Sequence, residues 1–337
     1  MKIGIEKTPH LRICVTERCA HNCFYCRPGG EACRVSNKKE MTLRQIYQLV
    51  KILADRGITH LKITGGEPLL RNDIPKMVSI LKSVRGITNI QLVTRSHRAG
   101  NIAEQLRDSG LDSITFSLDS LDPFIFYRIS QNSRLDLLLK AIKKTHEAGL
   151  NLQFNMVVVR GVNEHEITKM IEFAGRYGAV LKLLDLMNIP GDPKFLDFYY
   201  MPLDQIAADL KEKAVSYSME TQPGGLGTPM PKFLMSSGAV VLIKDARIGT
   251  WYGDVCKECK NFPCQDAIMA LRLTADGCLQ RCLLRQDNLV DLLSMTENFE
   301  SEDKIKQTID SVLSTFREAV YHEKAWRPKN CGWKLFI

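Results

Sequence analysis

The sequence predicts an α/β protein built on an open, partial (βα)6 barrel, and two observations predict it. Six short runs rich in apolar and β-branched residues alternate with stretches of helical periodicity between residues 10 and 186. Consecutive strands joined by helical crossovers run parallel, so these runs should form one parallel sheet. Six units are too few to close an eight-stranded barrel. We therefore expect a curved, open sheet with its functional residues at the carboxyl ends of the strands.

The predicted elements follow one another in a regular order. The strands are expected at residues 10–15, 60–64, 89–94, 112–118, 152–159 and 180–186. The helices are expected at residues 41–56, 72–84, 100–109, 134–148 and 164–177. Thr42 and Asn163 are expected N-caps, because an oxygen on a short side chain accepts hydrogen bonds from the first helical turn. Gly110 and Gly149 are expected C-caps, because glycine readily adopts the left-handed conformation that ends many helices.

Beyond residue 187 this alternation ends. Prolines and a glycine-rich loop interrupt the chain, and two further helices are expected near residues 203–216 and 302–319. We divide the chain into a barrel of residues 1–190, a linking segment of residues 191–250 and a C-terminal domain of residues 251–337.

Composition and charge limit the class of protein. The chain of 337 residues is 45% hydrophobic and 25% charged, as in ordinary globular proteins. Its formal charge of +8 is mild and includes no five-residue basic block, so nucleic-acid binding is not required, and a small anionic substrate fits equally well. The sequence has neither an apolar run of membrane-spanning length nor the features of a signal peptide. We expect a cytoplasmic protein without a membrane partner.

Cysteine is the most informative residue type. The 11 cysteines form two groups, with Cys331 alone near the end. The first group is Cys14, Cys19, Cys23, Cys26 and Cys33, and the second is Cys256, Cys259, Cys264, Cys278 and Cys282. Disulfide-rich scaffolds are short and secreted, and this chain is neither. The two groups therefore predict two metal centres.

The first motif has the spacing of a metal-binding loop. Cys19, Cys23 and Cys26 are separated by three and then two residues, directly after the first predicted strand. A 4Fe–4S cluster usually has four cysteine ligands, so three leave one iron free to bind another molecule. The alternatives are a zinc site, or a four-ligand cluster that includes Cys14 or Cys33. Cys14 lies within the predicted strand and is expected in the core.

Three further segments fall on the same predicted rim. Gly65-Gly-Glu-Pro68 follows the second strand, Ser117 ends the fourth, and Asn155 lies in the fifth. Glycines permit close approach of the backbone, and Glu67 offers an acceptor.

These motifs together resemble a known family. The segments 11–28 and 64–71 are similar to the radical S-adenosylmethionine (SAM) superfamily, and within it to the GTP 3′,8-cyclase (MoaA) family. The likeness continues through residues 116–121, 160–166 and 271–277. It implies a TIM-like partial barrel in which the three-cysteine cluster binds SAM and cleaves it reductively to a 5′-deoxyadenosyl radical. It also implies oxygen sensitivity and a reductant such as flavodoxin or ferredoxin.

The resemblance implies roles for residues at matching positions. Cys19, Cys23 and Cys26 would hold the SAM cluster. The SAM contacts would be Tyr25, Gly65, Gly66, Glu67, Pro68, Thr94, Ser117, Asn155 and Met187. The substrate contacts would be Arg12, Lys62, Arg71, Gln153, Lys182 and Arg272. Two departures stand out: residues 93–96 replace the usual Thr-Thr-Asn-Gly, and Gln153 stands where the family has a lysine.

The second cysteine group predicts an auxiliary centre. Cys256, Cys259 and Cys264 are closely spaced, and Cys282 follows at a distance, a pattern that suits zinc or an iron–sulfur cluster. Beside the radical SAM resemblance, it is similar to the twitch or SPASM domain and implies a second 4Fe–4S cluster. The GTP cyclases use three cysteines there and leave one iron open to the purine. Four thiolates here would leave none, which points away from orthodox GTP cyclisation.

Three functions remain open at this point. The first is hydrogen-atom abstraction from a small, anionic, nucleotide-like substrate, followed by cyclisation or rearrangement. The second is epimerisation or dehydrogenation of a sugar, nucleotide sugar or peptide residue, with Cys33, Cys278 or Cys331 as a hydrogen donor or with the auxiliary cluster as electron acceptor. The third is a non-catalytic metal-cluster protein that binds nucleic acid. Whether the enzyme is a lyase, an isomerase or an oxidoreductase stays open.

Overall fold

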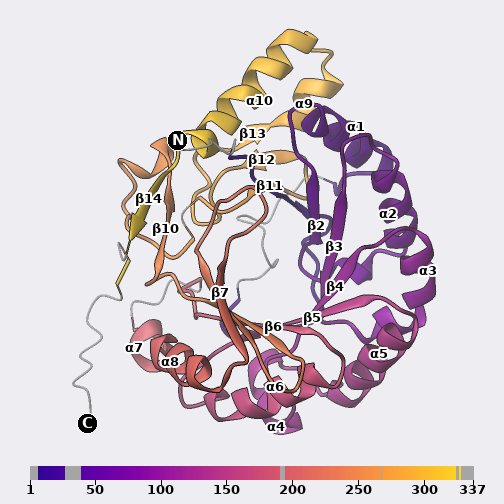
Figure 1. The fold of residues 1–337 in the computed structure, drawn as a ribbon. Coiled ribbons are helices and arrows are strands. Elements are labelled where there is room, and N and C mark those ends of the chain that lie inside the picture. The colour runs from indigo at the N-terminus through magenta and orange to yellow at the C-terminus, as the bar shows by residue number, and fades with distance from the viewer. Residues whose placement is uncertain (1–6, 27–38, 190–193, 267, 324–325, 328–337) are drawn as a thin grey trace.

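The computed structural model describes residues 7–26, 39–189, 194–266, 268–323 and 326–327. Cys33 and Cys331, two of the expected hydrogen donors, lie outside the described residues. Figure 1 shows a long curved sheet with helices along its outer side. No helix among the described residues is long and apolar enough to cross a membrane.

The six predicted strands are confirmed. They are β1 (Leu11–Cys14), β2 (His60–Thr64), β3 (Asn89–Thr94), β4 (Ser113–Ser117), β5 (Asn151–Val157) and β6 (Val180–Leu184). Each strand pairs with the next in parallel. Alternate side chains of each strand face the helices, among them Ile13 and Ile63, which have no exposed surface. The intervening side chains, such as Arg12 and Lys62, face the inside of the curve.

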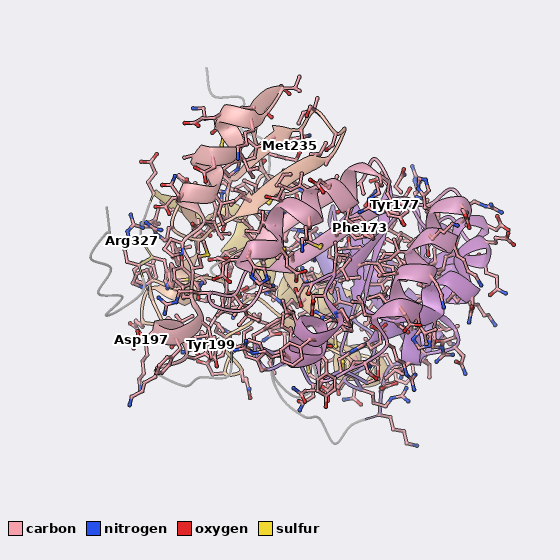
Figure 2. All side chains as sticks on the ribbon, turned by 90° about the horizontal axis from the view of Figure 1, so that it is seen from below. Phe173, Tyr177, Asp197, Tyr199, Met235 and Arg327 are labelled. Atoms are coloured by element: carbon pink, nitrogen blue, oxygen red, sulfur yellow. The ribbon has the colours of Figure 1, made fainter. Side chains whose placement is uncertain are left out.

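The predicted helices between these strands are also confirmed. They are α1 (Leu43–Ala54), α2 (Ile74–Lys82), α3 (Ala103–Asp108), α5 (Leu135–Glu147) and α6 (Ile167–Gly175). Short 3-10 turns, η1 (Pro68–Leu70), η2 (His97–Asn101) and η3 (Glu164–Glu166), precede α2, α3 and α6. In α6, the ring of Phe173 lies 5.2 Å from that of Tyr177 and 5.3 Å from that of Phe154 in β5 (Figure 2). Aromatic packing of this kind fixes the helix against the sheet.

Between the six predicted strands, the structure adds one helix that periodicity did not predict. This is α4 (Pro123–Ser130), between β4 and α5. The side chain of Asp122 accepts hydrogen bonds from the backbone of Phe124 and Ile125, and proline occupies the first turn.

The predicted caps are right in three cases and wrong in one. The hydroxyl of Thr42 accepts from the backbone N–H of Gln45 in a capping box, while Gly110 and Gly149 have φ of 90° and 83°. Asn163 makes no capping hydrogen bond. Its buried amide instead accepts from Val159 N and donates to the carbonyls of Asp119 and Val157. These bonds tie together the loops that follow β4 and β5.

Strands from the second half of the chain extend the sheet at both ends. Beyond β6 lies β9 (Val240–Lys244), also parallel, followed by the antiparallel β8 (Met230–Leu234) and β7 (Ser216–Glu220). Beyond β1 lies β11 (Leu271–Leu273), also parallel, followed by the antiparallel β12 (Cys278–Gln280) and β13 (Val290–Asp291). The described residues thus form one sheet of twelve strands, eight of them in a continuous parallel run. The division at residues 190 and 250 stays a prediction, since all three segments contribute strands to this sheet.

The remaining elements lie around the open side of the curve. They are α7 (Phe195–Tyr199), α8 (Asp204–Lys213), η4 (Asp254–Cys256), α9 (Leu292–Glu297), α10 (Glu302–Arg317), and the antiparallel pair of β10 (Gly249–Tyr252) with β14 (Val320–Glu323). Figure 1 shows the β10–β14 pair across the curve from α2 and α3. The helices α8 and α10 confirm the two predicted near residues 203–216 and 302–319.

Candidate active site

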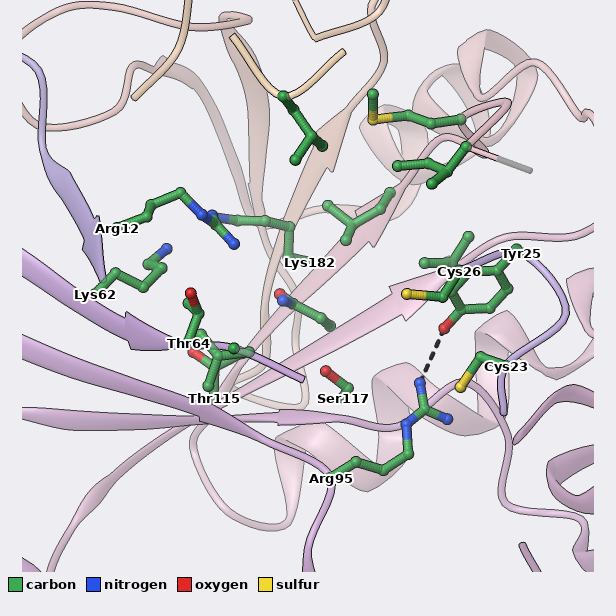
Figure 3. Close-up of a pocket in the computed structure, with 18 of the residues that line it drawn as sticks. Arg12, Cys23, Tyr25, Cys26, Lys62, Thr64, Arg95, Thr115, Ser117 and Lys182 are labelled. Atoms are coloured by element: carbon green, nitrogen blue, oxygen red, sulfur yellow. Dashed lines mark hydrogen bonds between the residues drawn. The ribbon is translucent and has the colours of Figure 1, made fainter. Parts of the chain in front are cut away.

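The inside of the curved sheet holds a cavity of about 620 Å³. Its lining comes from β1 to β6, from β9 and β11, and from the loops at the carboxyl ends of the strands. A cavity of this size at this end of a parallel sheet is the usual position of an α/β active site. Figure 3 shows the side chains that converge on it.

The first cysteine motif forms part of the cavity wall. Cys19, Cys23 and Cys26 all line it. The loop is anchored on the end of α4, where the backbone of Phe24 donates to the carbonyl of Ile129 over 3.2 Å. The ring of Phe24 also packs 5.2 Å from that of Tyr199 in α7. The helices α4 and α7 therefore hold the cysteine loop in place.

The donor set of this loop fits a cluster with three cysteine ligands. Of the two alternative fourth ligands, Cys33 lies outside the described residues. The other, Cys14, is buried in β1, does not line the cavity, and donates its thiol to the carbonyl of Thr16. Burial raises the pKa of Cys14 to about 12 and that of Cys23 to about 11. The three thiols that line the cavity are the number that leaves one iron of a 4Fe–4S cluster open.

The Gly-Gly-Glu-Pro loop packs directly on the cysteine loop. A Cβ atom at Gly66 would lie 2.2 Å from the carbonyl oxygen of Arg18, and one at Gly65 would lie 2.5 Å from that of Thr16. The backbone N–H of Gly66 donates to Thr16 O, and that of Glu67 donates to Arg18 O, each over 2.8 Å. The glycines are therefore required for the contact between the two loops.

Glu67 is the buried hub of this contact. Its carboxylate accepts from the hydroxyl of Thr94 at 2.5 Å, from the backbone of Arg95 at 2.8 Å and from that of Leu69 at 3.0 Å. Burial raises the pKa of Glu67, while these hydrogen bonds oppose the shift.

Most of the expected SAM contacts reach the cavity. Those that line it are Tyr25, Gly65, Gly66, Glu67, Thr94, Ser117, Asn155 and Met187. Pro68 does not line it and instead begins η1. The hydroxyl of Tyr25 donates to Asp119 at 2.5 Å, a buried carboxylate that the sequence did not single out.

A cationic wall faces the cysteine loop across the cavity. Arg272, Arg12 and Lys62 occupy adjacent register positions on β11, β1 and β2. Figure 3 shows the charged ends of Arg12, Lys62 and Lys182 turned toward one another. Burial lowers the pKa of Lys182 to about 8 and lowers that of Lys62 strongly. Because burial disfavours their charged form, these side chains would be stabilised by a bound anion.

Arg71 is the one expected substrate contact that the structure does not bring to the cavity. Its guanidinium donates to the carbonyls of Val15 and Met41 and pairs with Asp73 at 2.7 Å. These bonds hold the loop after β2 in place, which is a structural role. Gln153 does line the cavity, as do several polar residues that the sequence did not single out, among them His10, Asp185 and Lys244.

The second cysteine group also comes together. Cys256, Cys259, Cys264 and Cys282 line one small second cavity, as their predicted grouping requires. Cys278, an expected hydrogen donor, is buried in β12 and lines neither cavity.

Asp266 connects the two cavities. It pairs with Arg272 of the first cavity at 2.8 Å and accepts from the backbone of Leu283, next to Cys282, at 2.6 Å. Asp266 therefore links the wall of the large cavity to the residue that follows Cys282.

This fold and this site define a radical SAM enzyme. Residues 13–174 match the model of the radical SAM superfamily. That class implies a 4Fe–4S cluster and SAM as cofactors, and Cys19, Cys23 and Cys26 line the cavity in this structure.

Comparison with known proteins narrows the class to a family. The chain is 30% identical over 326 residues to the GTP 3′,8-cyclase of Syntrophomonas wolfei, covering 96% of this chain and 93% of the relative. It is 33% identical over 302 residues to a Pyrococcus abyssi protein named "Probable GTP 3′,8-cyclase", covering 88% and 91%. The chain belongs to the family of radical SAM proteins that includes these cyclases.

Solved structures agree on the fold. Streptococcus suis SuiB bound to S-adenosylmethionine superposes with a TM-score of 0.60 at 14% identity, over 91% of this chain and 68% of SuiB. The anSMEcpe structure with bound AdoMet gives 0.52 at 14% identity, over 89% and 82%. Both support a partial TIM-like barrel.

Proposed function

We propose that this radical SAM enzyme abstracts a hydrogen atom from a small, anionic, nucleotide-like substrate, in a cyclisation or rearrangement other than orthodox GTP 3′,8-cyclisation. The supporting observation is the charge of the cavity. Among the described residues, six side-chain cations line it against four carboxylates. Buried cations without enough carboxylates favour an anionic ligand, and phosphate is the anion for which lysine and arginine are best suited.

The chain's own residues would divide the work between the two ends of the cavity. When bound, the cluster and SAM supply a one-electron cleavage that yields a radical able to abstract hydrogen. Cys19, Cys23 and Cys26 would hold the cluster, and the loop around Glu67 would orient SAM. Arg12, Lys62, Lys182 and Arg272 would bind the substrate anion at the opposite wall. Enclosure by the curved sheet would exclude water from the reacting atoms.

We further propose a second 4Fe–4S cluster held by the four cysteines of the small cavity. Four thiolates would complete its coordination, so that it would transfer electrons or stabilise the fold rather than bind the substrate through iron. This difference supports a reaction related to, but distinct from, that of the cyclase relatives. A one-electron donor such as flavodoxin or ferredoxin would reduce the protein.

Epimerisation needs a thiol beside the substrate. Of the three expected donors, Cys278 lines neither cavity, whereas Cys33 and Cys331 lie outside the described residues, so this alternative stays a prediction. A cavity of this size fits a small molecule better than nucleic acid.

The test is turnover of defined anions by anaerobically reconstituted protein. The four ribonucleoside triphosphates and representative nucleotide sugars are incubated separately with SAM and reductant. We expect 5′-deoxyadenosine to form faster with one phosphorylated compound, together with a new product of that compound, and Cys23→Ala to form neither. Formation of the GTP 3′,8-cyclase product as the main product would contradict the proposed difference. If only an uncharged compound accelerated 5′-deoxyadenosine formation, the proposal of an anionic substrate would be contradicted.

A further inference from the structure

Arg95 occupies an unusual position beside the cysteine loop. It follows β3 in the segment that departs from the family pattern, and only 8% of it is exposed. Its backbone N–H donates to Glu67. Its guanidinium reaches across the cavity wall and lies within the site, not on the surface.

Two residues fix the orientation of this guanidinium. One nitrogen, Nη2, donates to the hydroxyl of Tyr25 at 2.9 Å and to Asp119 at 2.6 Å. Asp119 is itself held, because its other oxygen accepts from the backbone of Val157 at 2.9 Å. The charge is therefore held in place by a buried hydrogen-bond network.

The second nitrogen, Nη1, is buried and makes no hydrogen bond to any described residue. Figure 3 shows the guanidinium beside the hydroxyl of Tyr25 and near the sulfur of Cys23, with which Arg95 interacts electrostatically. Buried donors are almost always paired, so this N–H requires an acceptor that the described residues do not supply. Cysteine sulfurs and the inorganic sulfides of a cluster are acceptors of that kind.

We propose that Arg95 sets the reduction potential of the cluster held by Cys19, Cys23 and Cys26. Reduction adds one electron, taken from the external one-electron donor, and makes the cluster more negative without a proton. A fixed cation in a low-dielectric site stabilises that reduced form and so raises the potential. Arg95 acts through the cluster and its ligands, so it is a positioning residue. The role rests on the radical SAM class and is independent of the substrate proposed above.

The experiment is a redox titration followed by electron paramagnetic resonance. Wild-type, Arg95→Gln and Arg95→Lys proteins are reconstituted and titrated without SAM or substrate. In a parallel sample, the signal that changes when SAM is added is assigned to this cluster. We expect the potential of Arg95→Gln to shift to more negative values and that of Arg95→Lys to stay close to wild type, because lysine keeps the charge.

The test includes a matched control and a variant that should shift the reduction potential in the opposite direction. Arg98→Gln removes an exposed arginine that bonds to Asn72, and should leave the potential unchanged. Asp119→Asn removes the carboxylate that partly neutralises Arg95, so the potential should shift to more positive values. If Arg95→Gln does not retain iron, the potential of Asp119→Asn still tests the proposal.

Two results would overturn the proposal. One is an iron-replete Arg95→Gln protein with the wild-type potential, above all if it binds SAM more weakly, since Arg95 would then hold the SAM carboxylate instead. The other is an iron-replete Asp119→Asn protein whose potential is unchanged or more negative. Both measurements need no substrate, so they stand even if the proposed substrate class is wrong.

Discussion

Gly66 shows how single residues hold the two cofactor loops together. Its Cα lies so close to the backbone of Arg18 that no side chain fits between them. The sequence motif marked this position, because adjacent glycines indicate close backbone approach. His10, Asp119, Asp185 and Lys244 were not marked, since a lone polar residue carries no local signal of the cavity it will face.

Replacing Gly66 by alanine should separate the two loops. The added Cβ would crowd the carbonyl of Arg18, so we expect the free energy of unfolding to fall by about 1–3 kcal/mol and SAM binding to weaken. Denaturant unfolding and SAM titration measure the two effects. Gly161→Ala is the control, because its φ of 68° adds strain while its Cβ would meet nothing. Normal SAM affinity in Gly66→Ala would show that this loop contact is not needed for SAM binding.

Lys182 should make anion binding dependent on pH. Burial lowers its pKa to about 8, with Lys244 and Arg12 acting in the same direction and Glu220 opposing them. The ammonium is charged below that pH and loses its charge as the pH rises through it. We expect tripolyphosphate to bind about tenfold more weakly at high pH, a loss of ~1.5 kcal/mol, by calorimetry. Lys182→Arg should remove most of this decline, because arginine stays charged. An identical decline in that variant would exclude Lys182 as its cause.

At the scale of elements, α4 is the helix of the barrel that periodicity did not predict. Its residues are apolar on several faces, so it lacks a clear amphipathic stripe. The Asp122–Pro123 pair is a helix-start signal that could have found it. The helix matters because the cysteine loop donates two backbone hydrogen bonds to its last carbonyls, from Asn22 and from Phe24.

Removing the cap of α4 should therefore loosen the cysteine loop. Asp122→Ala deletes two hydrogen bonds to the first turn, and we expect unfolding to become easier by about 1 kcal/mol. Hydrogen exchange should also speed up at the amides of Asn22 and Phe24. Ser301→Ala, which removes the cap of α10, should cost a similar amount without changing these two amides. Equal protection of the loop in both variants would show that α4 does not anchor it.

For the molecule as a whole, long-range strand pairing joins the two cysteine regions. The pairing of β11 with β1 puts Arg272 beside Arg12 and brings the second cysteine group next to the large cavity. The sequence indicated the six-stranded core because each unit is local. It could not indicate that β9 and β11 continue the parallel sheet, because their partners lie more than 50 residues away and no local pattern selects them.

The second cysteine group allows a test of the four-thiolate site. Cys264→Ala should lower the iron content of reconstituted protein and change its absorption spectrum, because one of four ligands is lost. Cys278→Ala is the control, since this neighbouring cysteine lines neither cavity and should leave the iron content unchanged. Iron content and spectra that are the same in Cys264→Ala as in wild type would remove Cys264 from the ligand set.

The central claim is that three thiolates hold a cubane whose remaining iron binds SAM. Electron–nuclear double resonance of the reduced protein, mixed with SAM labelled with ¹⁷O in its carboxylate and ¹⁵N in its amino group, tests it most directly. We predict hyperfine coupling from both labels, and its absence in Cys23→Ala. An iron-replete wild-type protein that shows neither coupling, or zinc in place of iron at these cysteines, would contradict the account.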